Sequence, residues 1–169
     1  MESRELLLTA FDDIETFVRG ALDGVDPALL TERLDPDANT IAWLVWHLTR
    51  VQDDHVAEVA GTPQTWTAGG WAERFDLPFD ADATGYGFSS ADVGNTRITD
   101  PQLLVDHHAA VHRRTAEYLG SLSDADLDRV VDDSFDPPVT LGVRLVSVVG
   151  DDLQHAGQAA LLRGLLERR

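Results

Sequence analysis

Apolar side chains recur three or four positions apart in four long stretches of the chain, which is the spacing of one buried face of an α-helix. Ordinary helix signals bound these stretches, such as Gly61 after the second and Asp100 with Pro101 before the third. No run alternates apolar and polar residues as a half-buried strand does. The pattern predicts an all-α four-helix bundle, built as a single domain over residues 1–169. The four predicted helices cover residues 3–23, 40–60, 101–122 and 140–166.

The connection between the second and third predicted helices is long and rich in aromatic residues. Residues 62–98 contain several glycines and break the helical pattern. A loop of this length is uncommon inside a compact domain and is often functional. We expect it to pack its aromatic side chains over one end of the bundle, near His47. These side chains are Trp66, Trp71, Phe75, Phe79, Tyr86 and Phe88.

The chain has 30 acidic and 13 basic side chains, which give it a formal net charge of −17. A surface this acidic repels phosphate backbones and anionic lipid headgroups, so we expect neither nucleic acid nor a membrane as a partner. There is no cysteine, which excludes disulfides and any cysteine nucleophile or thiolate ligand of the chain's own. The first residues carry acids within the apolar run, unlike a signal peptide, so we expect a cytoplasmic location.

Asp151 and His155 are the first candidates for chemistry. They are four residues apart on the apolar face of the fourth predicted helix, where an acid and an imidazole at this spacing converge on one point. Asp152, three residues before His155, could reach the same region. A carboxylate among apolar side chains is costly unless a cation or a donor accompanies it. A divalent metal ion would meet this need, and so would an Asp–His hydrogen bond in the core.

His47 is the candidate for a third ligand. It lies in the middle of the second predicted helix among apolar neighbours, and can therefore share one level of the bundle with Asp151 and His155. A lone histidine in such a position is also common as an ordinary core residue, and this alternative stays open.

Three other histidines are weaker candidates. His108 and His112 form an H-x-x-x-H pair on the third predicted helix, but Arg113 beside His112 places that residue toward solvent. His55 is eight residues from His47, or ~12 Å along a helix. Both cannot bind one ion directly, so His55 is expected at the rim of the site or in a structural role.

The segments NTIAWLVWHLTRVQDDH and VSVVGDDLQHAGQAA resemble the DinB/YfiT-like superfamily, most closely its actinobacterial branch related to the metal-binding domain of mycothiol-dependent maleylpyruvate isomerase. The resemblance extends over nearly the whole chain, and W-H-L at 46–48 and H-A-G-Q at 155–158 are its most specific parts. It implies a bundle with crossover connections and a metal, often zinc or nickel, held by one histidine of the second helix and an H-x-x-x-H pair of the last. Here those positions are His47, Asp151 and His155, so an acid replaces the middle histidine.

The resemblance also implies a function. Characterised relatives are transferases and isomerases that use a low-molecular-weight thiol such as mycothiol. We therefore expect a metal-dependent S-transferase or isomerase that acts on a small electrophile, with the thiol as cosubstrate. A metal-dependent hydrolase and a non-catalytic, stress-related binding protein with a structural metal stay open, as does a homodimer. Further candidates, as partners of the ligands or as substrate contacts, are Trp43, His55, Asp152 and Gln158.

Overall fold

Helices dominate the structure, a computed structural model that describes residues 2–169. The four long helices are α1 (Ser3–Leu22), α2 (Ile41–Ala60), α6 (Pro101–Gly120) and α7 (Leu141–Leu166). The shorter elements are η1 (Pro27–Thr31), α3 (Thr65–Ala68), α4 (Trp71–Phe75), α5 (Ser90–Asn95), η2 (Asp124–Asp128), β1 (Val130–Asp132) and β2 (Val139–Thr140), where η marks a 3-10 helix. The mostly helical fold expected from the sequence is confirmed.

Local sequence explains where the long helices begin and end. The hydroxyl of Thr40 accepts a hydrogen bond from the backbone amide of Trp43 at the start of α2, and Asp100 accepts one from Gln102 at the start of α6. Gly61 ends α2 in the left-handed conformation, with φ of 67°. These caps satisfy backbone groups that the helices leave unpaired, and they set the helix bounds close to those predicted.

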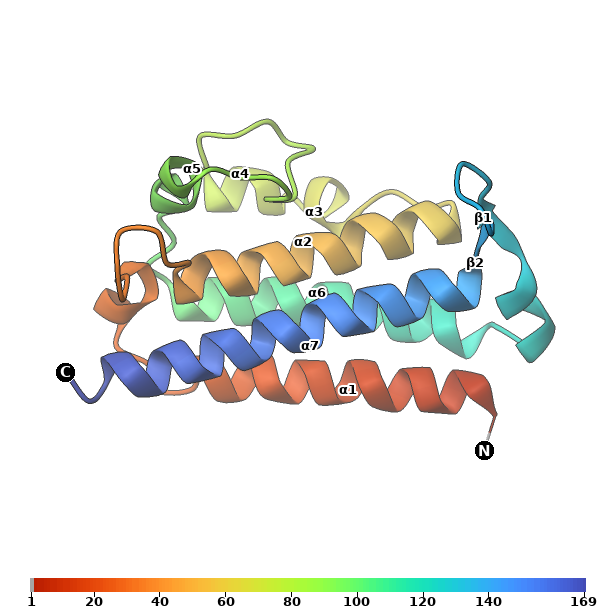
Figure 1. The fold of residues 1–169 in the computed structure, drawn as a ribbon, viewed down its shortest axis with the longest axis horizontal. Coiled ribbons are helices and arrows are strands. Elements are labelled where there is room, and N and C mark those ends of the chain that lie inside the picture. Colours follow the sequence, from red (N-terminus) through yellow and green to blue (C-terminus); the bar gives the residue numbers. More distant parts are fainter. Residues whose placement is uncertain (1) are drawn as a thin grey trace.

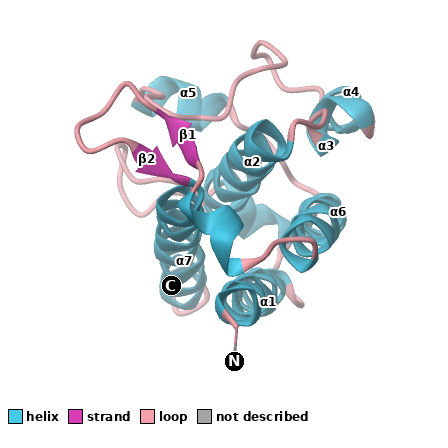
Figure 2. Ribbon diagram, turned by 90° about the vertical axis from the view of Figure 1, so that its right-hand side faces the viewer, coloured by secondary structure: helices cyan, strands magenta, loops and turns pink. Residues whose placement is uncertain are grey.

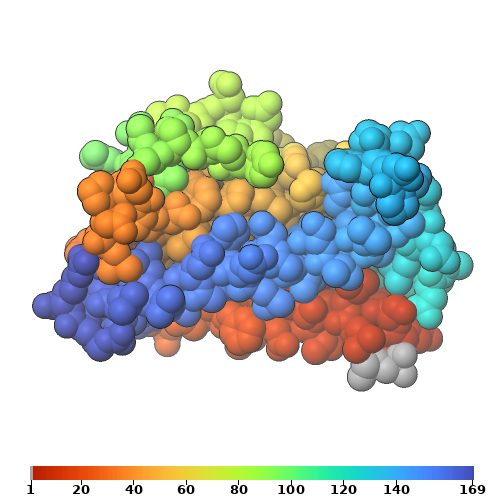
Figure 3. All heavy atoms as spheres, in the orientation of Figure 1, coloured from red at the N-terminus to blue at the C-terminus, as the bar shows by residue number. Residues whose placement is uncertain are grey.

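The four long helices lie side by side (Figure 1), with α1 and α2 each in contact with both α6 and α7. Helices α2 and α6 run in the same direction, so the chain must return along the molecule between them. This return is the segment 61–100, which contains α3, α4 and α5 and covers much of α2 from one side (Figure 3). Viewed along the helices, α3 lies against α2 and α6 (Figure 2).

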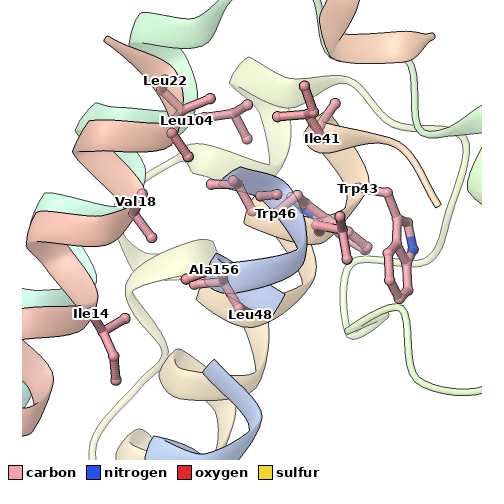
Figure 4. Close-up of a cluster of buried hydrophobic side chains, with 14 of the residues drawn as sticks. Ile14, Val18, Leu22, Ile41, Trp43, Trp46, Leu48, Leu104 and Ala156 are labelled. Carbon is pink, nitrogen blue, oxygen red and sulfur yellow. The ribbon is translucent and has the colours of Figure 1, made fainter. Parts of the chain in front are cut away.

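The core lies between the four long helices, and each contributes fully buried aliphatic side chains. Ile14, Leu48, Leu104 and Leu145, one from each helix, are at most 1% exposed. Figure 4 shows part of this cluster, in which Ala156 of α7 lies close to the side chains of α2. Among the described residues, no helix is long and apolar enough to cross a membrane.

Trp66, Trp71 and Phe75 of the segment 61–100 are buried and Phe79 and Phe88 are partly buried, but the expectation that Tyr86 packs on the bundle was wrong, since Tyr86 is 90% exposed. The main partner of the buried rings also differs from the expected one. Trp66, Trp71 and Phe75 surround His107 of α6, with ring centroids 5.1–5.3 Å from its own. Trp66 also meets Trp46 of α2 edge-on. The segment therefore packs its rings on α6 and α2, and reaches His47 mainly through its backbone, as described below.

A short antiparallel hairpin was not expected from the sequence. Val130 in β1 pairs with Thr140 in β2, directly before α7 begins. Strands of two and three residues are too short to show an alternating pattern in the sequence, and a hairpin this small leaves the mostly helical fold unchanged.

Candidate metal centre

His47 is held in a defined orientation on α2. Its side chain is buried, and the ring of Trp43 stacks on it with a centroid distance of 4.6 Å and an interplanar angle of 13°. Nδ1 of His47 lies 2.6 Å from the carbonyl oxygen of Thr84. Because a carbonyl can only accept, Nδ1 must carry the proton, and Nε2 keeps a free lone pair.

A side chain of the same helix orients His155 on α7. Its Nδ1 lies 3.1 Å from Oε1 of Gln158, one turn further along. An amide oxygen accepts, so the proton of His155 also resides on Nδ1 and its Nε2 is free. That Nε2 lies 3.6 Å from Oδ1 of Asp151. Gln158, a candidate partner of the ligands, contacts His155 as a hydrogen-bond acceptor.

The side chains of His47, Asp151 and His155 come together at one point. Each offers one ligand atom, and these atoms lie within 4.8 Å of one another. The two imidazole rings are 4.9 Å apart between centroids. No other group of three such side chains converges in this way within residues 2–169. The geometric part of the expectation is met, and the binding of a cation there stays a prediction.

Of the two neighbouring acids, Asp151 faces the histidines and Asp152 faces the core. The side chain of Asp151 is 38% exposed, so the expected burial of this acid is only partial, although its Oδ2 is buried without a hydrogen-bond partner among the described residues. Asp152 is completely buried, and neither of its oxygens has such a partner. Burial, and then the charge of Asp151, raise the pKa of Asp152 well above its usual value. The burial of Asp152 thus favours its neutral form, and Asp152 is not part of the converging group.

The electrostatics of His47 favour a neutral imidazole. Burial lowers its pKa below the usual value and outweighs the hydrogen bond to Thr84, which raises it. The nearby His155 lowers the pKa further, whereas the charge of Asp151 raises it. A neutral imidazole is the form that binds a metal ion.

The loop that contacts His47 depends on a glycine that the sequence reasoning missed. Gly85 follows Thr84 and has φ of +91°, a conformation that other residues rarely adopt. A Cβ atom at this position would lie 2.9 Å from Nδ1 of His47 and 2.9 Å from the ring of Trp46. Only glycine lets the backbone approach the imidazole this closely.

Two charged residues of α2, also missed, fix the same segment. Nε of Arg50 donates to the carbonyl of Ala83 at 3.2 Å, directly before the residue that contacts His47. Asp53 accepts from the backbone amides of Thr65 and Trp66, at 2.8 and 2.7 Å, and pairs with Arg50 at 3.4 Å. His47, Arg50 and Asp53 are spaced three residues apart. This spacing of polar groups on one helix face was the signal available in the sequence.

A cavity of about 420 Å³ opens beside the converging side chains, with His47 and Asp151 among its lining residues. His55 lines its other end, and its Nδ1 lies 2.9 Å from Nη1 of Arg144. His55 thus lies at the edge of the cavity, and it also contacts Arg144. The two expected places of His55, at the rim of the site and in a structural role, are both compatible with this position. Trp43, a candidate partner of the ligands, contacts both His47 and His155.

The second histidine pair lies elsewhere in the molecule. Nε2 of His112 is 3.0 Å from a carboxylate oxygen of Asp12 on α1. The expectation that His112 faces solvent was wrong, since the residue is only 8% exposed. Its neighbour Arg113 takes the outward direction because adjacent residues point about 100° apart around a helix. His108 is fully buried and has no hydrogen-bond partner among the described residues.

A divalent cation suits these residues. Two imidazole nitrogens carry free lone pairs, and one buried carboxylate oxygen lacks a partner. Imidazole and carboxylate are common ligands of zinc and related ions. Ligand atoms at ~2.1 Å from a tetrahedral ion are ~3.4 Å apart. The ligand atoms here lie within 4.8 Å of one another, so the widest pair would close by at most ~1.4 Å.

Comparison with known proteins agrees with this description of the fold. A conserved protein from Enterococcus faecalis, known from its crystal structure, superposes with a TM-score of 0.93 and 27% sequence identity, over 100% of this chain and 99% of that one. A comparison with curated proteins finds no match. The family model described as the DinB superfamily matches residues 10–159. The chain therefore belongs to the DinB superfamily.

Proposed function

We propose that this chain holds one divalent cation between Nε2 of His47, Nε2 of His155 and the carboxylate of Asp151. The observation that carries the proposal is the pair of Nδ1 hydrogen bonds, to Thr84 and Gln158, which leave both Nε2 lone pairs free beside an acid. Outer partners of this kind orient imidazole ligands in metal sites. Zinc and nickel are the ions favoured by the resemblance. The carboxylate shifts the preference toward a harder ion than three histidines would select.

The cation, when bound, would supply a positive charge that lowers the pKa of a thiol or a water in the cavity. The chain itself prepares the surroundings. Trp43 stacks on one face of His47 and meets His155 edge-on, which supports the orientation of both rings. Thr84 and Gln158 accept from the two Nδ1 atoms, so in the neutral form of each ring it is the Nε2 lone pair that is available to the ion. The cavity of about 420 Å³ provides space for a small molecule.

We infer that the reaction is thiol-dependent transfer or isomerisation of a small electrophile. In the transfer, the thiol sulfur bonds to the electrophilic carbon, the leaving group departs with the electron pair, and the thiol proton goes to solvent. The chain has no cysteine, so the thiol is a separate cosubstrate, for which mycothiol is the candidate that the resemblance offers. The net charge of −17 argues against a nucleic-acid substrate.

The cavity favours catalysis over a purely structural metal, because a structural ion is usually enclosed by four protein ligands. Hydrolysis would use the same open position with water in place of the thiol, and it is the second candidate. A homodimer is not required for the site, since the three side chains come from one chain.

Metal content tests the site. Wild-type protein, His47→Ala and His155→Ala would be purified in parallel, with His112→Ala as a matched histidine control outside the site. We expect the wild type and the control to retain the ion through dialysis, and the other two variants to lose it. Equal occupancy in all four proteins would disprove the assignment.

Activity of the metal-loaded protein separates the reactions. With 1-chloro-2,4-dinitrobenzene as the electrophile, conjugation that requires an added thiol supports the transferase. Chloride release without a thiol supports the hydrolase. Metal binding with neither reaction, across a panel of electrophiles and thiols, would favour the structural role.

A further inference from the structure

The cavity beside the three candidate ligands is an elongated slot between α2 and α7. On α2 it extends from His47 to His55, eight residues or ~12 Å along the helix. On α7 it extends from Asp151 toward Arg144, which contacts His55 across the slot. Asp54 of α2 and Ser147 of α7 also line it.

The far end of the slot presents an oriented hydrogen-bond donor. Nη1 of Arg144 lies 2.9 Å from Nδ1 of His55. A guanidinium has only donors, so Nδ1 of His55 must accept, and the ring proton resides on Nε2. The side chain of His55 is 35% exposed and lines the cavity. Its Nε2–H is therefore free to donate to a molecule in the slot.

The charges around this end disfavour an anionic ligand. Arg144 pairs with Glu58 at 3.5 Å and with Asp132 at 3.3 Å, which leaves little of its positive charge for a ligand. Asp54 lines the slot, and its Oδ1 already accepts from the amide of Gln64. A carboxylate tail would meet these acids in a protein whose net charge is already −17. A hydroxyl, in contrast, can accept from His55 and donate to Asp54.

We propose that this slot is the subsite for the tail of the thiol cosubstrate, and that it selects an uncharged, hydroxyl-bearing tail through His55. The inference rests on the proposed function, because it places the thiol at the His47–Asp151–His155 end. The tail then extends about 10 Å along the slot and ends with its hydroxyl groups between His55 and Asp54. Ser147 of α7 adds a second hydroxyl group along the path.

Four thiols test the proposal on the cobalt(II)-loaded protein, in which sulfur coordination produces a charge-transfer band that reports binding without turnover. N-(2-mercaptoethyl)gluconamide carries a hydroxylated tail. N-(2-mercaptoethyl)hexanamide has an apolar tail of the same length, and the corresponding adipic acid monoamide ends in a carboxylate. The fourth, 2-mercaptoethanol, is too short to reach His55. We expect the gluconamide to bind about tenfold more tightly than the other two long thiols, which corresponds to one or two good hydrogen bonds.

Variants assign this preference to His55. His55→Phe keeps a ring but removes the donor, and we expect it to abolish the preference while 2-mercaptoethanol binds as to the wild type. His55→Gln, which retains a donor, should restore part of the preference. His112→Phe is the matched control on α6 and should behave as the wild type.

The outcomes distinguish a failure of the tail subsite from a failure of thiol binding at the metal. A band with 2-mercaptoethanol but equal affinity for the three long thiols would overturn the subsite and leave the proposed function intact. A preference that survives in His55→Phe would overturn the role of His55. No band with any thiol would overturn thiol binding at the metal and the subsite together.

Discussion

Two imidazole protons decide whether His47 and His155 can serve as ligands. Each proton is fixed on Nδ1 by an acceptor, one from a loop backbone and one from a side chain of the same helix. The partners of a ligand therefore matter nearly as much as the ligand itself.

Replacing Gln158 with leucine should weaken metal binding without disturbing the fold. The change removes the acceptor for Nδ1 of His155, so the ring can turn and its proton can move to Nε2. We expect a ~10–100-fold loss of zinc affinity, the usual effect of removing such a partner. Gln154→Leu is the matched control, because Gln154 donates only to the carbonyl of Gly150 on the exposed side of α7. Competition with a chromogenic chelator measures both, and equal affinities would contradict the role of Gln158.

Gly85→Ala should impair the site through sterics alone. The new methyl group would lie 2.9 Å from Nδ1 of His47, in a backbone conformation that alanine rarely adopts. We expect weaker metal binding and a free energy of unfolding lower by ~1–3 kcal/mol. Gly87→Ala provides the control, since Gly87 also has a positive φ, of +72°, but has open space around it. If the two variants bind metal equally well, the contact between Gly85 and His47 has no importance for the site.

Polar side chains on one face of α2 hold both ends of the stretch from α3 to Thr84 within the segment 61–100. Asp53 binds the start of α3, Arg50 binds Ala83, and His47 binds Thr84. Metal binding and the position of the segment 61–100 should therefore depend on each other.

Asp53→Asn tests this arrangement. The carboxylate of Asp53 accepts two backbone amides and pairs with Arg50, and an amide side chain cannot do all three. We expect the free energy of unfolding to fall by ~1–3 kcal/mol, because Arg50 is left buried without its charge partner. Faster amide hydrogen exchange in residues 64–84 should accompany the loss. Asp54→Asn, which keeps an acceptor for Gln64, should change stability far less. Equal effects of the two substitutions would refute the special role of Asp53.

For the molecule as a whole, buried histidines make stability depend on pH. Burial, and then the charge of His112, lower the pKa of His108 from 6.5 to about 3. Burial also lowers the pKa of His107 well below its usual value. In both cases the folded state excludes a proton that the unfolded chain binds. The stabilising effect is complete above pH 6.5 and is lost as the pH falls from 6.5 toward the folded-state pKa.

His108→Leu isolates this effect. Between pH 7 and pH 5 we expect the free energy of unfolding of the wild type to decrease by about 2 kcal/mol relative to the variant. Asp152, whose pKa is raised, acts in the opposite direction in both proteins and cancels in the comparison. Urea unfolding at the two pH values gives the difference. A difference that stays constant between pH 7 and pH 5 would show that His108 takes up its proton in the folded state as readily as in the unfolded chain.

The helices were predictable from the sequence because their causes are local. Apolar spacing sets the buried face of each long helix, and caps such as Thr40 and Asp100 act within four residues. The spacing of Asp151 and His155 is local too, and with the family resemblance it was enough to suggest the converging group. The hairpin at Val130 was not predictable, because its pairing is too short to leave a periodic trace.

Only the tertiary structure decided how the site is assembled. Periodicity could not choose between Asp151 and Asp152, since the rotation of α7 against α2 determines which acid faces His47 and which is buried. Nor could it reveal the carbonyl of Thr84, because every residue has a carbonyl and only the path of the chain brings this one to Nδ1. Arg144 and His55 are 89 residues apart and meet only because α2 and α7 pack together. The amino-acid sequence alone thus determined the helices and the candidate ligands, whereas packing between distant segments fixed the proton of His47, the acid that faces it and the slot beside them.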